Sequence, residues 1–268
     1  MAKIRLDTLL YQEGFTDSRE RAKAIIMAGE VTVNGKVIDK PGTNVNSDVI
    51  IHISSSSPRY VSRGGLKLEK AIQEFGINFS SAVVLDVGAS TGGYTDCALQ
   101  HGAAKVYAVD VGYGQLDWKL RNDVRVINME KTNVRYMSRE DLGEKVDFIT
   151  VDVAFISTRL VFPVLKDLLK DNGIIISLIK PQFEAGKKQV GKKGVVKDPE
   201  IHRRVLDDCI KYAAGAGMVC TGVTYSPITG PSGNIEYFIK LEKNTIIDIN
   251  LEETMNLVVD EAHRQLGG

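Results

Sequence analysis

Short apolar runs alternate with longer amphipathic stretches along most of the chain. The runs have the length of buried strands, and the stretches between them carry apolar residues at helical spacing. Strands that alternate with helices are typical of a parallel sheet that is covered on both faces. The predicted strands are Val83–Val87, Val106–Val109, Val124–Ile127, Phe148–Val151 and Gly173–Ile179, and the predicted helices are Gly64–Phe75, Ser157–Leu169 and Pro199–Ala214.

The end of the chain follows a different pattern. Two further apolar runs, Val219–Ser226 and Tyr237–Leu241, are joined by a segment with no room for a crossover helix. Because a parallel return needs a dozen or more residues, these two strands are predicted to be antiparallel. A last helix is predicted over Leu251–Gln265. The predicted fold class is therefore α/β, with a mostly parallel sheet and an antiparallel last strand.

Residues 1–58 carry a pattern of two short helices followed by short strands. The second helix is predicted to be capped by Asp17, with Glu20 three residues later as the reciprocal capping partner. The dipeptide Asn34-Gly35 lies between two β-branched runs and is a strong hairpin signal. Val49–Ile53 is predicted as the closing strand. This part of the chain is therefore expected to form a small α+β domain.

The clearest boundary in the chain is Ser54–Pro58, where four serines and a proline favour an extended linker. We therefore divide the chain into a small N-terminal domain (1–58), an interdomain segment (59–65) and a large domain (66–268). No internal repeat is evident in the sequence.

Composition narrows the functional classes. The chain has 268 residues, of which 43% are hydrophobic, and Lys+Arg equal Asp+Glu at 34 each, so the net charge is zero. This excludes a uniformly basic nucleic-acid binder, and any basic binding surface must be a local patch. The three cysteines lack a C-x-x-C pairing, which argues against a disulfide framework or a zinc site and fits the reducing cytoplasm. We expect no signal peptide, membrane span or metal site.

A glycine-containing turn follows the first predicted strand of the large domain. The segment Asp86–Gly93 has the spacing G-x-x-x-G-G rather than the G-x-G-x-x-G of dinucleotide-binding folds. A carboxylate beside the turn repels a pyrophosphate but suits a cationic ligand such as S-adenosylmethionine. Asp110, one strand later, lies where ribose hydroxyls are usually bound. The predicted cofactor-binding residues are Asp86, Gly88, Ala89, Ser90, Gly92, Gly93 and Asp110.

Four charged residues are predicted to meet at one edge of the sheet. Asp152 and Lys180 close two of the parallel strands, and Glu236 opens the antiparallel last strand. Lys67 lies near the start of the helix that leads back into the glycine-loop strand. In open parallel sheets, ligands bind outside the carboxyl ends of the strands. The topology therefore directs all four side chains to one rim, although each alone is also typical of a solvated strand end.

These motifs resemble a known family. The glycine loop with Lys67, Asp152, Lys180 and Glu236 is similar to the Rossmann-type, S-adenosylmethionine-dependent RNA 2′-O-ribose methyltransferases that have a Lys-Asp-Lys-Glu tetrad. The N-terminal pattern resembles an S4 RNA-binding domain, and it consists of Arg5-Leu6-Asp7, Ser18-Arg19, Ala22, Gly29, Val31 and Val33-Asn34-Gly35. Together with the joining segment Pro58–Gly65, the combination closely resembles the TlyA family, often labelled hemolysins.

The resemblance implies methylation of a cytidine ribose in ribosomal RNA, in one or both ribosomal subunits, with S-adenosylmethionine as the cofactor. The tetrad residues would be catalytic. A general base needs a pKa near the working pH, and burial or a nearby cation lowers the pKa of a lysine. We therefore assign the base to Lys180 and expect burial and Lys67 to lower its pKa. Asp152 would orient Lys180, while Lys67 and Glu236 would pair and position the ribose.

Two local basic patches are predicted to contact RNA phosphates. Residues 1–58 hold seven basic and seven acidic residues, so a basic surface there requires that the charges segregate onto faces. The second patch is a glycine-interrupted loop after Lys180, which is otherwise interpreted as a solvated loop. The predicted RNA contacts are Arg5, Arg19, Arg21, Lys23 and Lys36 in the small domain, Arg59 and Arg63 in the joining segment, and Lys187, Lys188, Lys192, Lys193 and Lys197 in the loop.

Three other functional classes are alternatives to a methyltransferase. A non-catalytic RNA-binding or ribosome-assembly factor, which would be supported by cofactor binding without methyl transfer, is disfavoured by the intact tetrad. A membrane-active hemolysin is disfavoured because no signal peptide, membrane span or long amphipathic repeat is evident. An NAD-dependent enzyme is disfavoured by the spacing of the glycine loop and by Asp86.

Overall fold

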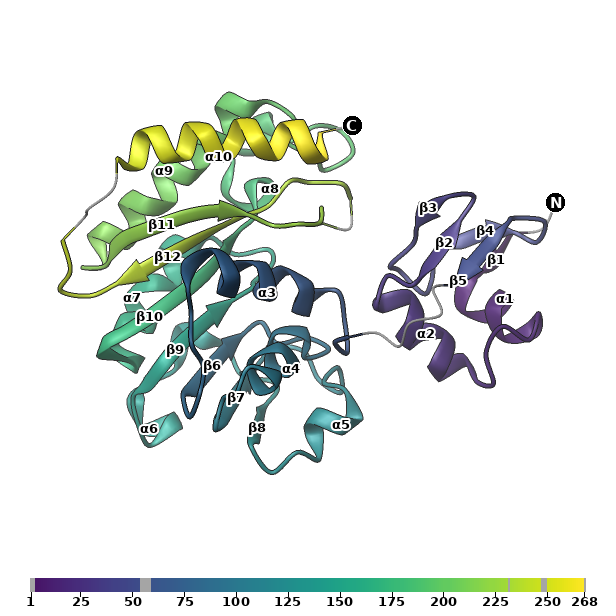
Figure 1. Ribbon diagram of the computed structural model, residues 1–268, viewed down its shortest axis with the longest axis horizontal. Coiled ribbons are helices and arrows are strands. Elements are labelled where there is room, and N and C mark those ends of the chain that lie inside the picture. The colour runs from purple at the N-terminus through teal and green to yellow at the C-terminus, as the bar shows by residue number, and fades with distance from the viewer. Residues whose placement is uncertain (1–2, 54–58, 231, 247–249, 268) are drawn as a thin grey trace.

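The computed structural model describes residues 3–53, 59–230, 232–246 and 250–267, and it shows a small N-terminal domain beside a larger one (Figure 1). The predicted linker Ser54–Pro58 lies outside the described residues. The elements of the small domain are β1 (Lys3–Arg5), α1 (Leu6–Gln12), α2 (Arg19–Met27), β2 (Val31–Val33), β3 (Lys36–Val37), β4 (Asn44–Asn46) and β5 (Ile51–Ile53).

The small domain is an α+β unit with its own apolar core. Its strands form two sheets: the antiparallel pair β1 and β4, and the order β3-β2-β5. The predicted hairpin turn is confirmed, because Asn34 and Gly35 both have the positive φ angles that such a turn requires. The predicted cap of α2 is wrong. Ser18, not Asp17, caps the helix, because its side-chain oxygen accepts from the backbone N–H of Arg21.

The large domain contains one seven-stranded sheet, in the order β11-β12-β10-β9-β6-β7-β8. Its elements are α3 (Gly64–Phe75), β6 (Val83–Val87), α4 (Gly93–Gln100), β7 (Lys105–Val109), α5 (Trp118–Arg121), β8 (Val126–Met129), η1 (Val134–Tyr136), α6 (Arg139–Leu142), β9 (Val146–Val151), η2 (Thr158–Leu160), α7 (Phe162–Leu168), β10 (Leu169–Ile179), α8 (Pro181–Glu184), η3 (Lys187–Gln189), α9 (Pro199–Gly215), β11 (Val219–Tyr225), β12 (Tyr237–Glu242) and α10 (Leu251–Leu266).

The directions of the strands confirm the predicted fold class. The strands β6 to β10 pair in parallel, whereas β12 is antiparallel to both β10 and β11. Because β12 runs in reverse, its first residue lies at the edge where the parallel strands end. The structure is a Rossmann-like α/β domain with a mixed sheet, joined to the small α+β domain.

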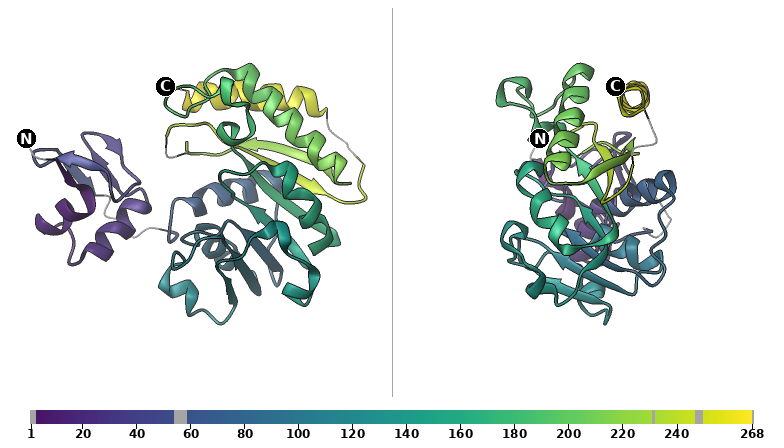
Figure 2. Two further views of the ribbon diagram at one scale, coloured as in Figure 1. Left: turned by 180° about the vertical axis from the view of Figure 1, so that it is seen from behind. Right: turned by 90° about the vertical axis from the view of Figure 1, so that its left-hand side faces the viewer.

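Neighbouring residues of each strand face opposite sides of the sheet, so two cores form. Val84 packs with α3 and α4 on one side, whereas Leu85 packs with the side that α7, α9 and α10 cover. Helices thus cover both faces of the sheet (Figure 2). No helix within the described ranges is long and apolar enough to cross a bilayer.

Several predicted boundaries differ from the observed ones. The helix predicted over Ser157–Leu169 is divided into η2 and α7, and Leu169 already begins β10. Pro163 lies in the first turn of α7, where the missing N–H of proline costs no hydrogen bond. The strand predicted over Val124–Ile127 lies two residues later, at Val126–Met129.

Candidate active site

A cavity of about 710 Å³ lies at the edge of the sheet where the parallel strands end. The loops that follow β6, β7, β8, β9 and β10 all contribute to its wall. Lys67, Asp152, Lys180 and Glu236 line one part of it. The four residues thus share one cavity, although they come from segments far apart in the sequence.

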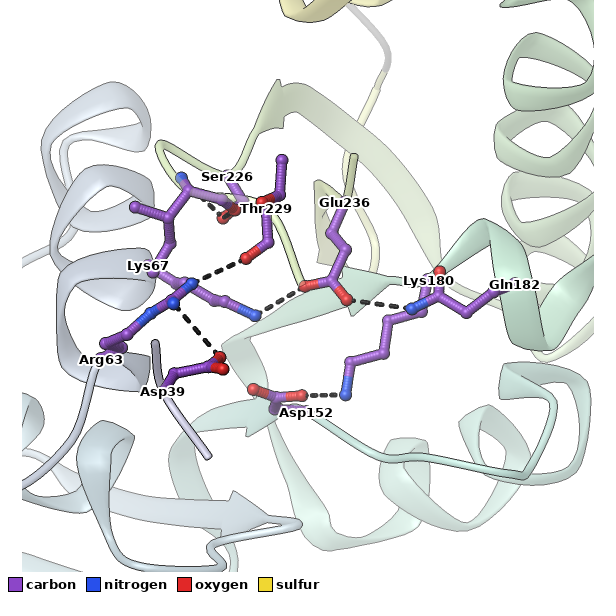
Figure 3. Close-up of polar contacts among 10 residues, drawn as sticks. Asp39, Arg63, Lys67, Asp152, Lys180, Gln182, Ser226, Thr229 and Glu236 are labelled. Carbon is purple, nitrogen blue, oxygen red and sulfur yellow. Dashed lines mark hydrogen bonds and ion pairs between the residues drawn. The ribbon is translucent and has the colours of Figure 1, made fainter. Parts of the chain in front are cut away.

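The four side chains form two lysine–carboxylate pairs (Figure 3). Lys180 Nζ pairs with Asp152 Oδ1. Lys67 Nζ donates to Glu236 Oε2 at 2.6 Å, and Gln182 Nε2 donates to Glu236 Oε1 at 3.1 Å. Glu236 is fully buried and Lys67 is 8% exposed. Buried charges need partners of this kind, because each ion loses its hydration.

The electrostatics correct one prediction. Burial lowers the pKa of Lys180, as expected, but the negative charges of Asp152 and Glu236 outweigh it and raise the pKa above the ordinary value of 10.5. Burial likewise raises the pKa of Asp152, but the charges of Lys180 and Lys67 outweigh that effect and hold it below its ordinary value. The pair is therefore ionised in the free protein.

The glycine loop forms one wall of the cavity. Gly88 has a φ of 87° and lies against the backbone carbonyl of Asp152, where no side chain fits. Ala89, Ser90 and Gly93 also line the cavity. Gly92 does not. It has a φ of 95° and packs against two leucines of the α5 region, so the prediction that Gly92 contacts a cofactor is not supported.

Asp86 was also predicted to hold the cofactor, but the structure does not place it in the cavity lining. The carboxylate is 1% exposed and lies behind the glycine loop, outside the cavity wall. It accepts hydrogen bonds from the hydroxyls of Thr95 at 2.6 Å and Thr150 at 3.0 Å. Burial raises its pKa to about 6 despite these two bonds. Asp86 is therefore a support beneath the loop.

This burial predicts a pH-dependent stability. The pKa of Asp86 is higher in the folded protein than in the unfolded chain. The contribution of Asp86 to the free energy of unfolding is therefore full below pH 4 and is lost as the pH rises through 6. Asp86→Asn removes the buried charge while keeping the shape. The free energy of unfolding of wild type relative to the variant should fall by about 2 kcal/mol between pH 4.5 and 7.5, measured by urea titration. If the difference in free energy of unfolding between the two proteins were the same at both pH values, the pKa of Asp86 would not be raised by folding.

Asp110 lies where predicted, at the end of β7, and lines the cavity. Its two carboxylate oxygens accept from the backbone N–H groups of Ser90 at 2.8 Å and Gly112 at 2.7 Å. These bonds fix the carboxylate and tie the glycine loop to the loop after β7. Sequence reasoning missed Gln115 and Asn133, which also line the cavity. Their only signal was their position after β7 and β8.

The predicted RNA contacts of the small domain lie at its surface. Arg5 and Arg19 both pair with the buried carboxylate of Asp7. The hydrogen bond from Arg5 makes the largest contribution to lowering the pKa of Asp7, which is about 2. Each arginine remains about half exposed, with its guanidinium held in place. Arg21 and Lys36 are exposed and Lys23 is partly exposed.

In the joining segment, the two arginines predicted to contact RNA already have partners within the protein. Arg63 is mostly buried, and its guanidinium binds Asp39 of the small domain at 3.2 Å and the carbonyl of Thr229 at 2.8 Å (Figure 3). It is therefore not free to bind a phosphate. Arg59 is exposed but pairs with Glu69. The joining segment holds the two domains together through Arg63.

The lysine-rich loop after α8 lies at the surface. All five of its lysines, Lys187, Lys188, Lys192, Lys193 and Lys197, are exposed. Across the part of the chain that the structure describes, no group of three or more His, Cys, Asp or Glu side chains could hold a metal ion.

The fold and the cavity define the class to which the protein belongs: an FtsJ-like methyltransferase joined to an S4 domain. The model of the FtsJ-like methyltransferase family matches residues 60–243, and the model of the S4 domain matches residues 4–51. More particularly, the chain belongs to the TlyA family, as its relatives show.

The chain is 49% identical to YqxC of Bacillus subtilis (strain 168), which is named for rRNA methyltransferase activity, over 98% of this chain and 95% of that protein. It is 43% identical to the 16S/23S rRNA (cytidine-2′-O)-methyltransferase TlyA of Mycobacterium tuberculosis (strain ATCC 25618 / H37Rv), over 91% of each chain. A solved structure of a hemolysin-named protein from Streptococcus thermophilus is 43% identical and superimposes with a TM-score of 0.79, covering 100% of this chain and 98% of the other.

Proposed function

We propose that the protein transfers a methyl group from S-adenosylmethionine to the 2′-oxygen of a cytidine ribose in ribosomal RNA. The observation that carries this proposal is the two lysine–carboxylate pairs beside the glycine loop, of which Lys67–Glu236 is buried and Lys180–Asp152 is mostly buried. The Mycobacterium tuberculosis relative is named for this reaction in both ribosomal subunits. A ribosomal substrate also implies that the protein works in the cytoplasm.

The cavity fits S-adenosylmethionine in size and chemistry. Its volume of about 710 Å³ lies within the roughly 300–1,000 Å³ typical of small-molecule sites. Asp110 offers a fixed carboxylate for the ribose hydroxyls of the cofactor. Gly88 and Ser90 both have positive φ angles and form a tight turn at the cavity wall, where Gly88 has no side chain that would separate its backbone from a bound cofactor. When bound, the cofactor supplies an electrophilic methyl group on a positively charged sulfur.

Replacing Asp110 tests this assignment. Asp110→Ala removes charge-assisted hydrogen bonds to the cofactor and releases the backbone N–H groups that hold the glycine loop. S-adenosylmethionine should bind about 1–3 kcal/mol more weakly, as measured by calorimetry. Asp123→Ala serves as a control, because Asp123 is a loop carboxylate that pairs with Arg125 away from the cavity. Equal affinity in the Asp110 variant would remove Asp110 from the site.

In the proposed mechanism, Lys180 would accept the proton of the ribose hydroxyl as the hydroxyl oxygen bonds to the methyl carbon, and the sulfur–methyl bond of the cofactor would break with its electron pair left on the sulfur. Asp152 holds the Lys180 ammonium and aligns its nitrogen. Lys67, fixed by Glu236, donates to the ribose and positions it. Alignment of the reacting atoms contributes much of the rate enhancement. Lys180 must first lose the proton that Asp152 and Glu236 stabilise on it.

The rim of the cavity also suits an unpaired nucleotide. Phe155 lines the cavity, is 89% exposed, and lies 4.8 Å from the ring of Phe183, measured between ring centroids. An exposed ring beside the tetrad offers a stacking face for a base, as is common in RNA recognition. The small domain and the lysine-rich loop would supply phosphate contacts.

The decisive experiment incubates the protein with labelled S-adenosylmethionine and purified ribosomal subunits, and then maps the methylated nucleotide. A 2′-O-methylcytidine in either subunit supports the proposal. Cofactor binding without methyl transfer would instead favour the ribosome-assembly factor. Lysis of erythrocytes by detergent-free protein would favour the hemolysin.

A further inference from the structure

The lysine-rich loop, residues 185–198, is anchored near its end by one buried side chain. Asn234 Oδ1 accepts from the backbone N–H of Val196 at 3.0 Å, and Asn234 Nδ2 donates to the carbonyl of Gly194 at 2.9 Å. A backbone N–H can only donate and a backbone carbonyl can only accept, so these two partners determine which way the side-chain amide of Asn234 is oriented. Asn234 and Val196 are each 2% exposed. The exposed lysines thus lie on a loop whose end is buried.

A histidine holds the same point of the loop. His202 Nε2 lies 3.0 Å from the carbonyl of Val196, and since a carbonyl only accepts, this nitrogen carries the proton. Nδ1 is then the acceptor, and it lies 2.8 Å from the hydroxyl of Tyr237 and 3.0 Å from Nε2 of His263. Burial lowers the pKa of His202 to about 4, so the ring is neutral. Val196 is therefore bound through both its N–H and its carbonyl.

The segment that anchors the loop also carries Glu236. Asn234 lies two residues before Glu236, and Tyr237 directly follows it. In α8, which leads into the loop, Gln182 donates to Glu236 Oε1 (Figure 3). The helix before the loop and the end of the loop are therefore both tied to Glu236 or to its immediate neighbours, and Glu236 in turn binds Lys67.

We propose that Asn234 is a positioning residue that holds the lysine-rich loop in register with Glu236, so that RNA phosphates bound by the loop lie in a defined place relative to the tetrad. The loop contains three glycines and would otherwise lose much conformational entropy when it binds RNA. Buried anchoring lowers that cost before RNA arrives. The inference rests on the proposed function, because it takes RNA as the ligand.

A double-mutant cycle tests this coupling. Replacing Lys192 and Lys193 by Gln in the wild-type loop should weaken ribosomal RNA binding about tenfold and reduce the salt dependence by the equivalent of two phosphate contacts. In the Asn234→Ala background, the same replacement should change affinity less than threefold, because the loop lysines no longer occupy fixed positions. The affinity for S-adenosylmethionine should stay within twofold of wild type in all four proteins.

A matched control uses the small domain. Replacing Arg21 and Lys23 by Gln should weaken RNA binding equally in the wild-type and Asn234→Ala backgrounds, because these residues have no link to the loop anchor. Asn234→Asp provides a second, nearly isosteric variant, which keeps the acceptor for Val196 and loses the donor for Gly194. In the Asn234→Asp background, as in the Asn234→Ala background, replacing Lys192 and Lys193 should change RNA affinity less than it does in wild type.

Two results separate the inference from the proposed function. Additive effects of the loop lysines and of both Asn234 variants on RNA affinity would overturn the positioning role, whether or not wild type methylates RNA. Absence of a 2′-O-methylated product with wild type would overturn the proposed function. The binding cycle needs no methyl transfer, so it still reports the coupling in that case.

Discussion

Lys180→Arg is expected to bind the cofactor and ribosomal RNA normally and yet to lose about 10²–10⁴ in the rate of methyl transfer, the usual contribution of a general base. Arginine keeps the positive charge beside Asp152 but cannot give up its proton under working conditions. A lysine that only attracted phosphate would be replaced well by arginine. The expected result is therefore specific to proton transfer.

Single-turnover kinetics with saturating cofactor would measure this effect on the chemical step. The matched control is Lys170→Arg, because Lys170 also pairs with a carboxylate, Asp147, at 2.6 Å but contributes nothing to the cavity wall. This control should keep a near-normal rate. Near-normal turnover by Lys180→Arg would remove the base from Lys180 and leave the methyltransferase class unchanged.

The second large effect concerns pH. The charges of Asp152 and Glu236 raise the pKa of Lys180, so only a small fraction is neutral in the free protein at pH 7. That fraction grows about tenfold per pH unit below the pKa. The value of kcat/KM should therefore rise about 100-fold between pH 7 and 9 without reaching a plateau.

Asp152→Asn should change the shape of this profile. Loss of the carboxylate removes one of the two charges that raise the pKa of Lys180, so the profile should level off at a lower pH, although the misaligned lysine reacts more slowly. Cofactor and RNA affinity measured at each pH would separate binding from chemistry. A flat profile for wild type would contradict a lysine base, and equal profiles for wild type and Asp152→Asn would contradict the role of Asp152 in setting the pKa.

Sequence alone was sufficient for the fold class, because local patterns determine it. Apolar runs separated by helical stretches required a parallel sheet, and the short connection before Tyr237 required an antiparallel last strand. The same topology was enough to direct Lys67, Asp152, Lys180 and Glu236 to one edge, since carboxyl ends of parallel strands meet there. The turn at Asn34-Gly35 depended only on local backbone preferences.

Only the tertiary structure determines the burial and the charged neighbours of each of these side chains. Asp86 lies within β6 and Asp110 directly follows β7, and only Asp110 lines the cavity, because packing buries Asp86 behind the loop against Thr95 and Thr150. The pKa of Lys180 depends on the distance to two carboxylates from other segments, and no local pattern encodes that distance. Asn234 had no recognisable motif, because its partners lie about 40 residues away and are backbone groups. Burial and charge–charge distance are properties of the packed chain, so only the three-dimensional arrangement determines them.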